Sequence, residues 1–395
     1  MAGMSRYRIR SNSLITGFSF TSMFFLGLGV AIVGAAAQNA GIRPEQVGYL
    51  LTAQHLGFFV TVAFAGGLAD RYSKPVVLAV ASLLLALGFA GFYAWESFVL
   101  NLAIMLVMGF GIGGYEGVTD ALILELHEDR KSLFVNLNHF FVTLGSLVIT
   151  MYLLLLQMAW RASMVQAAAV VAALGILYSV TRTGTVGGRA DRGAVGSSSR
   201  NSEAIVVLLR KPALWLLLIS MMVAVGVELG TIGILTTYLV ELRGFGDVTS
   251  KVALLLFLGG FGLGRITLAA VITDKAVEKW VASLFAASVL TTLLLYSLTS
   301  PWAIYAMSLL SGVTVSVVLP SIIATGAKRF PDQAGTAIGI IKMGIPVGGM
   351  VVPFFVSVLT SAFSLQVGLL LFPAVAGVGL AAFSPLLRQV AEPQS

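Results

Sequence analysis

Apolar stretches of about 20 residues recur along the whole chain and are separated by short polar segments. The first of them, Leu14 to Ala37, contains 24 residues and no ionisable side chain. A helix of this length crosses the ~30 Å hydrocarbon core of a bilayer. Lipid offers no partner to exposed backbone groups, and the chain lacks the alternation of barrel strands, so we expect helices. The pattern predicts an all-α integral membrane protein with twelve transmembrane helices, roughly at residues 12–37, 47–69, 75–94, 98–124, 131–157, 162–181, 212–240, 250–272, 279–299, 302–326, 333–359 and 364–385.

One long polar interval, residues 182–211, divides these spans into two sets of six. It is rich in Gly, Ser and Arg, which is the composition of a flexible linker. We therefore expect an N-terminal six-helix bundle over residues 1–181, a cytoplasmic linker over 182–211 and a C-terminal six-helix bundle over 212–395. Asp70-Arg71 follows the second span, and Asp274-Lys275 follows the eighth at nearly the same distance from the start of its half. Two related halves imply a substrate path between them.

The distribution of Lys and Arg predicts the orientation of the chain. Eighteen of the 24 basic residues fall in the segments that share a side with the N-terminus, four fall on the opposite side, and Arg265 and Lys342 lie within spans. Cytoplasmic loops carry the excess of Lys and Arg. We expect a multi-pass protein of the cell inner membrane with both termini cytoplasmic, and we interpret the apolar stretch after the basic N-terminus as a retained first span.

Composition excludes several classes of function. The chain is 58% hydrophobic and 10% charged, and its net charge of +7 comes from basic residues scattered over short loops, so no nucleic-acid surface is expected. It has no cysteine, and no HExxH motif, histidine cluster or nucleophile triad is present, so we expect no enzyme activity, no cofactor and no metal site. No nucleotide-binding segment or selectivity-filter pattern is present either. A secondary transporter remains.

Ionisable residues within the spans are the candidates for proton coupling, because such groups are costly in a bilayer unless they serve the bundle interior. Glu116 and Asp120 are four residues apart and share one helix face. Neighbouring carboxylates are typical of a proton carrier, since their mutual repulsion favours binding of a proton. Glu228 lies near the middle of the seventh span. Each of two residues has an alternative to proton coupling. Asp120 could belong to a loop network with Arg130, and Glu228 could be a structural partner of Lys342.

Four further residues are candidates for substrate binding. Asn136 and His139 lie on the fifth span. A second amide, Asn138, lies close to Asn136 on the same helix, and only one of the two can point directly into the substrate path. Lys342 in the eleventh span could hold a carboxylate or pair with Glu228, and Arg265 in the eighth could hold an anion or act as a gating residue.

The loop segment Gly66-Gly67-Leu68-Ala69-Asp70-Arg71-Tyr72-Ser73-Lys74 resembles the cytoplasmic signature of the major facilitator superfamily, with Ser73 in place of the usual glycine. Gly264-Arg265 with Asp274, and the segment 330–337, resemble its counterparts in the second half. The resemblance covers the whole chain and implies the major facilitator fold. It also implies that Asp70, Arg71 and Lys74 form a gating latch.

A narrower resemblance links the chain to the fucose–proton symporter family. Gly114-Tyr115-Glu116 and the segment 136–139 are similar to that family's motifs in helices 4 and 5. The resemblance implies that Glu116 corresponds to a glutamate used for substrate and proton binding. The family also uses an aspartate in helix 1, and Ala35 stands at that place here.

These observations predict a proton-coupled secondary transporter that moves a small polar solute, such as a sugar, by alternating access. Its expected partners are this solute, protons and the lipid bilayer, and we expect a monomer. Two alternatives stay open. One is an organic-anion transporter that uses Arg265 and Lys342, and the other is a proton-driven drug exporter.

Overall fold

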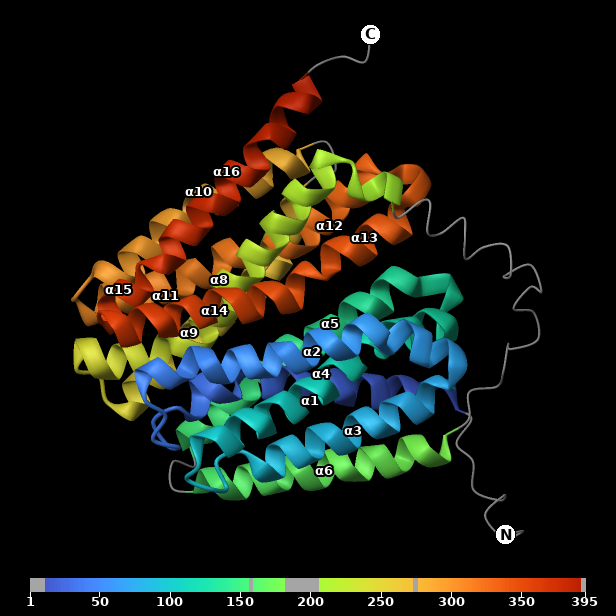
Figure 1. Cartoon of the computed structure of the whole chain (residues 1–395), viewed down its shortest axis with the longest axis horizontal. Helices are drawn as coiled ribbons and strands as arrows, with labels where there is room; N and C mark the ends of the chain where they lie inside the picture. Colours follow the sequence, from blue (N-terminus) through green and yellow to red (C-terminus); the bar gives the residue numbers. More distant parts are fainter. Residues whose placement is uncertain (1–10, 156–158, 182–205, 273–275, 392–395) are drawn as a thin grey trace. The chain divides into compact units, whose positions relative to one another are not determined.

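The computed structural model of the chain describes residues 11–155, 159–181, 206–272 and 276–391 (Figure 1). Within these ranges the protein is helical without strands, and twelve stretches are long and apolar enough to cross a membrane. The predicted all-α membrane fold with twelve spans is therefore confirmed. The first 24 residues of the predicted linker, 182–205, lie outside the described ranges.

The chain separates into two compact units. Unit 1 comprises the described residues up to Ile42 and those from Ala53 to Thr181, and unit 2 comprises Arg43–Thr52 and the described residues from 206 onward. The predicted domain limits stay a prediction. The helices of unit 1 are α1 (Asn12–Ala36), α2 (Pro44–Arg71) from Ala53 onward, α3 (Lys74–Gly91), α4 (Phe98–Leu126), α5 (Lys131–Leu155) and α6 (Trp160–Val180).

Unit 2 contains six further spans, and three of them are interrupted. The continuous ones are α8 (Pro212–Arg243), α9 (Asp247–Val271) and α10 (Val277–Ser297). The interrupted ones are α11 (Pro301–Ser316) with α12 (Val318–Arg329), α13 (Ala334–Lys342) with α14 (Gly344–Ala362), and α15 (Leu365–Leu369) with α16 (Leu371–Ala391).

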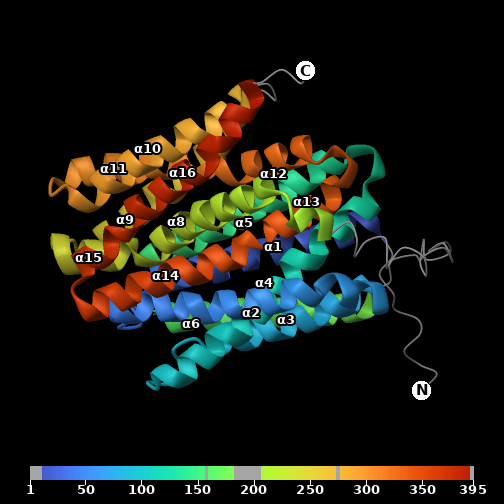
Figure 2. The same ribbon diagram turned by 45° about the horizontal axis from the view of Figure 1, so that its top comes forward.

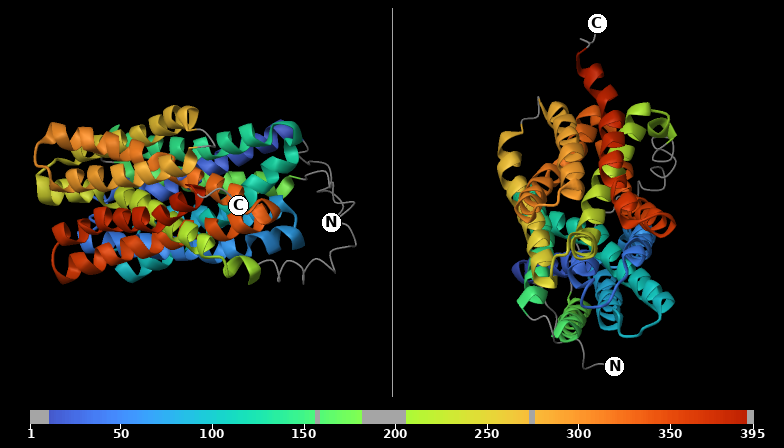
Figure 3. Two further views of the ribbon diagram at one scale, coloured as in Figure 1. Left: turned by 90° about the horizontal axis from the view of Figure 1, so that it is seen from above. Right: turned by 90° about the vertical axis from the view of Figure 1, so that its left-hand side faces the viewer.

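Within each unit the helices pack as neighbouring pairs that run alongside one another (Figures 2 and 3). In unit 1, α1 packs on α5, and α3 packs on both α4 and α6. In unit 2, α9 packs on α11, α8 on α14, and α10 on α16. The pairing of α1 with α5, and the contact of both with α4, position the polar side chains described below.

The three interruptions in unit 2 have one cause. Proline lacks the N–H that would bond to the carbonyl four residues earlier, and its ring clashes with that carbonyl. The helices α11, α13 and α15 end at Ser316, Lys342 and Leu369, each of which lies four residues before a proline. In the eleventh span the break at Lys342 is the one that precedes Pro346. Pro353 lies inside α14.

A repeat of helix crossings relates the two units. A Cβ atom on Gly109 of α4 would overlap the carbonyl oxygen of Gln54 on α2, and a Cβ atom on Gly312 of α11 would overlap the carbonyl oxygen of Phe257 on α9. Gly312 and Phe257 each follow their counterparts by 203 residues. Each unit therefore uses glycine at the same point, where two backbones are in contact.

Candidate functional site

An aspartate and a histidine are in contact in the interior of unit 1. Asp120 on α4 and His139 on α5 meet through Oδ2 and Nε2, which are 3.0 Å apart. Their side chains are 18% and 33% exposed, so both are largely withdrawn from the surface. The alternative interpretation of Asp120, a loop network with Arg130, stays open.

Glu116 belongs to the same group, one helical turn before Asp120 on α4. Donor atoms of Glu116, Asp120 and His139 all lie within 4.8 Å of one another, and all three residues are half-buried. The spacing of the two carboxylates predicted their common face, and folding brings the imidazole to that face. We call these three residues the Asp–His–Glu cluster.

Buried polar side chains hold Asp120 in place. Asn138 on α5 is fully buried and donates from Nδ2 to Asp120 Oδ1 at 3.0 Å and to Thr119 Oγ1 at 3.2 Å. Its carbonyl oxygen accepts a hydrogen bond from Ser19 Oγ on α1 at 3.1 Å, and Ser19 is also fully buried. One amide thus connects α1, α4 and α5, and it fixes one oxygen of Asp120 while the other faces His139.

A contact with α3 helps to set the rotation of α4. Tyr115 is fully buried, and its hydroxyl lies 2.6 Å from the hydroxyl of Ser82 on α3. Successive helix residues are turned by about 100°, so fixing Tyr115 toward α3 directs Glu116 elsewhere. This hydrogen bond helps to keep the carboxylate face of α4 toward α5.

Of the two amides on α5, the structure buries Asn138 and leaves Asn136 exposed. The sequence suggested that only one of them could face the path, and Asn136 was the predicted substrate-binding residue. That assignment of Asn136 stays a prediction. Asn138, Ser19 and Thr119 were not predicted as site residues, and the buried contact among them depends on the packing of α1 against α5.

A second group of charged side chains lies in unit 2. Glu228 on α8 is half-buried, and the charge of Arg265 on α9 acts on it. Arg265 Nε donates to the carbonyl oxygen of Ser316 at 3.4 Å, and its guanidinium carbon lies 4.4 Å from the centre of the Phe261 ring. The Ser316 carbonyl is the one that Pro320 leaves without a helix bond. The break between α11 and α12 therefore supplies an anchor for Arg265.

Lys342 ends α13, at the break caused by Pro346, and its side chain is half-buried. It follows His139 by 203 residues, the same spacing that relates Gly109 to Gly312. The fifth and eleventh spans thus carry a basic or titratable side chain at matching positions of the repeat. The predicted substrate-binding residues divide between the units, with Asn136 and His139 in unit 1 and Arg265 and Lys342 in unit 2.

The predicted gating residues lie where α2 ends and α3 begins. Lys74 forms a salt bridge with Glu125 near the end of α4. Arg71 is exposed, and its guanidinium carbon lies 5.9 Å from the centre of the Tyr72 ring. Asp70 is the penultimate residue of α2, and its side chain lies outside the described part of the structure.

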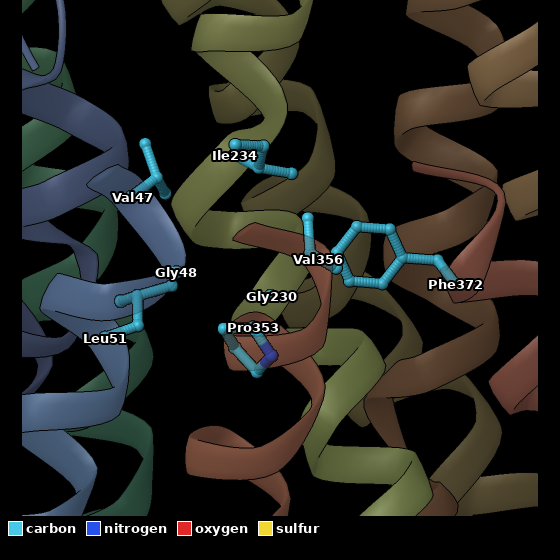
Figure 4. Close-up of a pocket in the computed structure, with 8 residues that line it drawn as sticks. All are labelled: Val47, Gly48, Leu51, Gly230, Ile234, Pro353, Val356 and Phe372. Atoms are coloured by element: carbon cyan, nitrogen blue, oxygen red, sulfur yellow. The ribbon is translucent and has the colours of Figure 1, made fainter. Parts of the chain in front are cut away.

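A small apolar gap lies within unit 2 and contains none of the predicted site residues. It has no room for a water-sized molecule, whereas typical ligand pockets enclose ~300–1,000 Å³. Gly48 donates its N–H to Ser357 Oγ at 2.8 Å beside it. The gap is a packing defect, lined by Val47, Gly48, Leu51, Gly230, Ile234, Pro353, Val356 and Phe372 (Figure 4).

Three solved transporter structures share this fold. One is a bacterial homolog of the human lysosomal transporter Spinster, in an inward-facing and occupied conformation. Its TM-score is 0.76 at 12% sequence identity, and the match covers 97% of this chain and 99% of the homolog. The nucleoside transporter NupG has a TM-score of 0.74, 14% identity, and coverage of 95% and 99%. The E. coli fucose:proton symporter FucP has a TM-score of 0.61, 19% identity, and coverage of 97% and 100%.

Sequence comparison gives a partial relative and a family. The niacin transporter NiaP of Acinetobacter baylyi is 25% identical over 164 residues, which are 38% of this chain and 37% of that protein. The chain thus spans little more than a third of this relative's length. The Major Facilitator Superfamily model matches residues 13–287. The family and the structural neighbours are transporters and not enzymes. Since the family match covers well over half of the sequence, the chain belongs to the Major Facilitator Superfamily.

Proposed function

We propose that the chain is a proton-coupled secondary transporter that moves a small polar solute by alternating access. The observation that carries this proposal is the Asp–His–Glu cluster, in which Asp120 Oδ2 lies 3.0 Å from His139 Nε2 within membrane-spanning helices. Ionisable groups are kept at such depth where they serve an ion or substrate pathway. A carboxylate in contact with an imidazole can exchange a proton over one hydrogen bond.

In this mechanism Glu116 and Asp120 carry the coupling proton, and His139 links the proton to the cargo. Glu228 is the second coupling acid, because it lies in the other unit within the electrostatic reach of Arg265. Binding of a proton to Glu228 changes the balance of charge around Arg265. A cargo that contacts Arg265 is then bound differently in the protonated and unprotonated states.

The proposed cargo is a small polar solute, with a sugar as the first class to test. Asn136, His139, Lys342 and Arg265 are the proposed cargo contacts, because they are polar side chains within the spans of both units. The fold neighbour FucP is described as a fucose:proton symporter. This description supports testing deoxy and neutral sugars before other solutes.

The proposed gate consists of Asp70, Arg71 and Lys74, whose interactions change between transport states. We place the protein in the cell inner membrane with both termini and residues 182–211 in the cytoplasm, because Lys and Arg concentrate on that side of the predicted topology. In this orientation the salt bridge of Lys74 with Glu125 lies at the cytoplasmic surface.

Proton coupling can be measured with a pH-sensitive dye enclosed in proteoliposomes. We expect an external sugar such as L-fucose or D-xylose to drive proton entry in the wild type. Asp120→Asn and Glu116→Gln should each abolish solute-driven proton movement and retain exchange of labelled solute, because the cargo contacts remain.

The control is Glu96→Gln, which removes an exposed carboxylate between α3 and α4 and should behave like the wild type. Accumulation of solute with unaltered pH dependence in Asp120→Asn and Glu116→Gln would show that these carboxylates do not carry the proton.

An organic anion is the second candidate cargo. The observation that favours it is that two basic side chains, Arg265 and Lys342, lie within spans of unit 2, where a carboxylate would find a charged partner. Niacin, the cargo in the name of the partial relative, carries such a group. Uptake by the wild type decides between the two cargoes: uptake of nicotinate without uptake of a neutral sugar supports the anion, and the reverse supports the sugar.

A further inference from the structure

The Asp–His–Glu cluster has the composition of a metal site, although neither the sequence motifs nor the spacing of residues predicted one. Its donors are two carboxylates and one imidazole, and their atoms all lie within 4.8 Å of one another. For any three atoms at such separations, there is a point that lies within about 2.8 Å of all of them. Shifts below about 1 Å therefore bring all three donors to the ~2.0–2.2 Å of metal–ligand bonds.

The residues around the cluster are those that a metal site uses. Ligating carboxylates are commonly held by outer hydrogen bonds. The fully buried Asn138 binds Asp120 Oδ1, and Ser19 in turn binds Asn138. The other oxygen of this carboxylate, Asp120 Oδ2, faces His139 Nε2 at a distance of 3.0 Å. This separation is typical of two neighbouring ligands on one ion.

The chemistry of the donors selects the class of ion. Carboxylates suit Mg²⁺, Ca²⁺ and Mn²⁺, whereas imidazole suits Zn²⁺, Fe²⁺ and other transition metals. A mixed set of two oxygens and one nitrogen favours first-row divalent ions such as Mn²⁺, Co²⁺ and Zn²⁺. Two ionised carboxylates with a neutral imidazole carry a charge of −2, which a divalent ion balances within the membrane. Three protein ligands leave positions open for water or cargo.

We propose that Glu116, Asp120 and His139 form a binding site for a divalent transition-metal ion, on the same carboxylates that the proposed function assigns to the proton. The ion and the proton then compete, since a metal ligand must be unprotonated. All three ligands and the residues that support them lie in unit 1.

Direct binding to the purified full-length chain tests this site, with any affinity tag removed and bound metal stripped by a chelator. Calorimetry with Zn²⁺ and visible absorption with Co²⁺ should show one ion per chain. His139→Gln and Asp120→Asn should each weaken binding at least 10-fold. Asn138→Ala should weaken it by about 10–100-fold, as is typical for the loss of an outer-sphere partner.

His127→Gln is the matched control. The chain has three histidines, and His127 lies at the end of α4, where its ring contacts Thr16 and Phe134 outside the cluster. This variant should bind Zn²⁺ and Co²⁺ like the wild type. Gel filtration and thermal unfolding confirm that every variant is folded before its affinity is compared.

Wild-type affinity in folded His139→Gln and Asp120→Asn overturns the proposal, as does equal loss of binding in His127→Gln. No binding of either ion by the wild type overturns it as well. These readouts need no transport. A chain that binds the ion at the cluster but moves no protons would therefore contradict the proposed function and leave the metal site standing.

Discussion

At the scale of single residues, Asn138 is the contact on which the candidate site depends. Its side chain bonds to Ser19 on α1 and to Asp120 and Thr119 on α4. Hydrogen bonds between membrane helices contribute on average ~0.6 kcal/mol, and at most ~1.7 kcal/mol. We expect Ser19→Ala and Asn138→Ala to lower the free energy of unfolding by about 1 kcal/mol each, with a coupling of about 0.5–1.5 kcal/mol in the double mutant. Unfolding in mixed detergent micelles measures both quantities.

Thr21→Ala provides the control on α1 for this cycle. The hydroxyl of Thr21 bonds to the carbonyl oxygen of Gly17 in its own helix. Combined with Asn138→Ala, it should give additive effects. Additivity of Ser19→Ala with Asn138→Ala would mean that the hydrogen bond between these residues does not support the site.

The sequence predicted the ionisable members of the site better than their support. Glu116 and Asp120 could be placed on one face because their spacing matches one helical turn, and His139 could be identified as titratable. The choice between Asn136 and Asn138 could not be made from spacing. It depends on the rotation of α5 against α4, which packing sets.

At the scale of helices, the crossing of α1 and α5 brings Ser19 to Asn138. A Cβ atom on Gly145 of α5 would overlap the carbonyl oxygen of Phe24 on α1. Overpacking costs about 1–3 kcal/mol where neighbours can shift, and a backbone carbonyl shifts less readily than a side chain. We expect Gly145→Ala to lower the free energy of unfolding by about 3 kcal/mol and to reduce uptake, because the two helices must separate. Thermal unfolding and liposome uptake measure these effects.

Gly17→Ala on α1 is the comparison for this variant. Nothing lies within 4 Å of a Cβ atom at Gly17, so the higher helix propensity of alanine should leave the stability equal or raise it by up to ~1 kcal/mol. Equal stability of Gly145→Ala and Gly17→Ala would show that the crossing tolerates a larger separation.

The prolines show how far helix geometry can be anticipated. A break four residues before Pro346 follows from the missing N–H, and α13 ends there, at Lys342. Pro353 has the same chemistry and yet lies inside α14. The sequence predicts a strained position at a proline within a span. The packing of the neighbouring helices decides whether the helix breaks or continues at the proline. That packing cannot be predicted from a single sequence.

At the scale of the molecule, the two units have an ion pair at matching positions of the repeat, with the positive and negative residues exchanged. Lys74 of α3 pairs with Glu125 of α4 in unit 1, and Glu278 of α10 pairs with Lys328 of α12 in unit 2. Lys328 follows Glu125 by 203 residues, and Glu278 follows Lys74 by 204. The repeat therefore keeps the ion pair and exchanges its signs. Burial differs, because the side chain of Glu125 is 59% exposed and that of Glu278 only 4%.

This difference predicts unequal costs for the same substitution in the two units. Removing one partner of an exposed pair costs below ~1 kcal/mol, whereas an unpaired buried charge costs about 3–5 kcal/mol. We expect Lys74→Met to lower the free energy of unfolding by less than ~1 kcal/mol. Lys328→Met should lower it by about 2 kcal/mol, since the charge of Arg329 also acts on Glu278 and offsets part of the loss. Adding Glu278→Gln should recover stability in Lys328→Met, because it removes the buried charge. Equal costs in the two units, or no recovery, would mean that burial does not set the strength of these ion pairs.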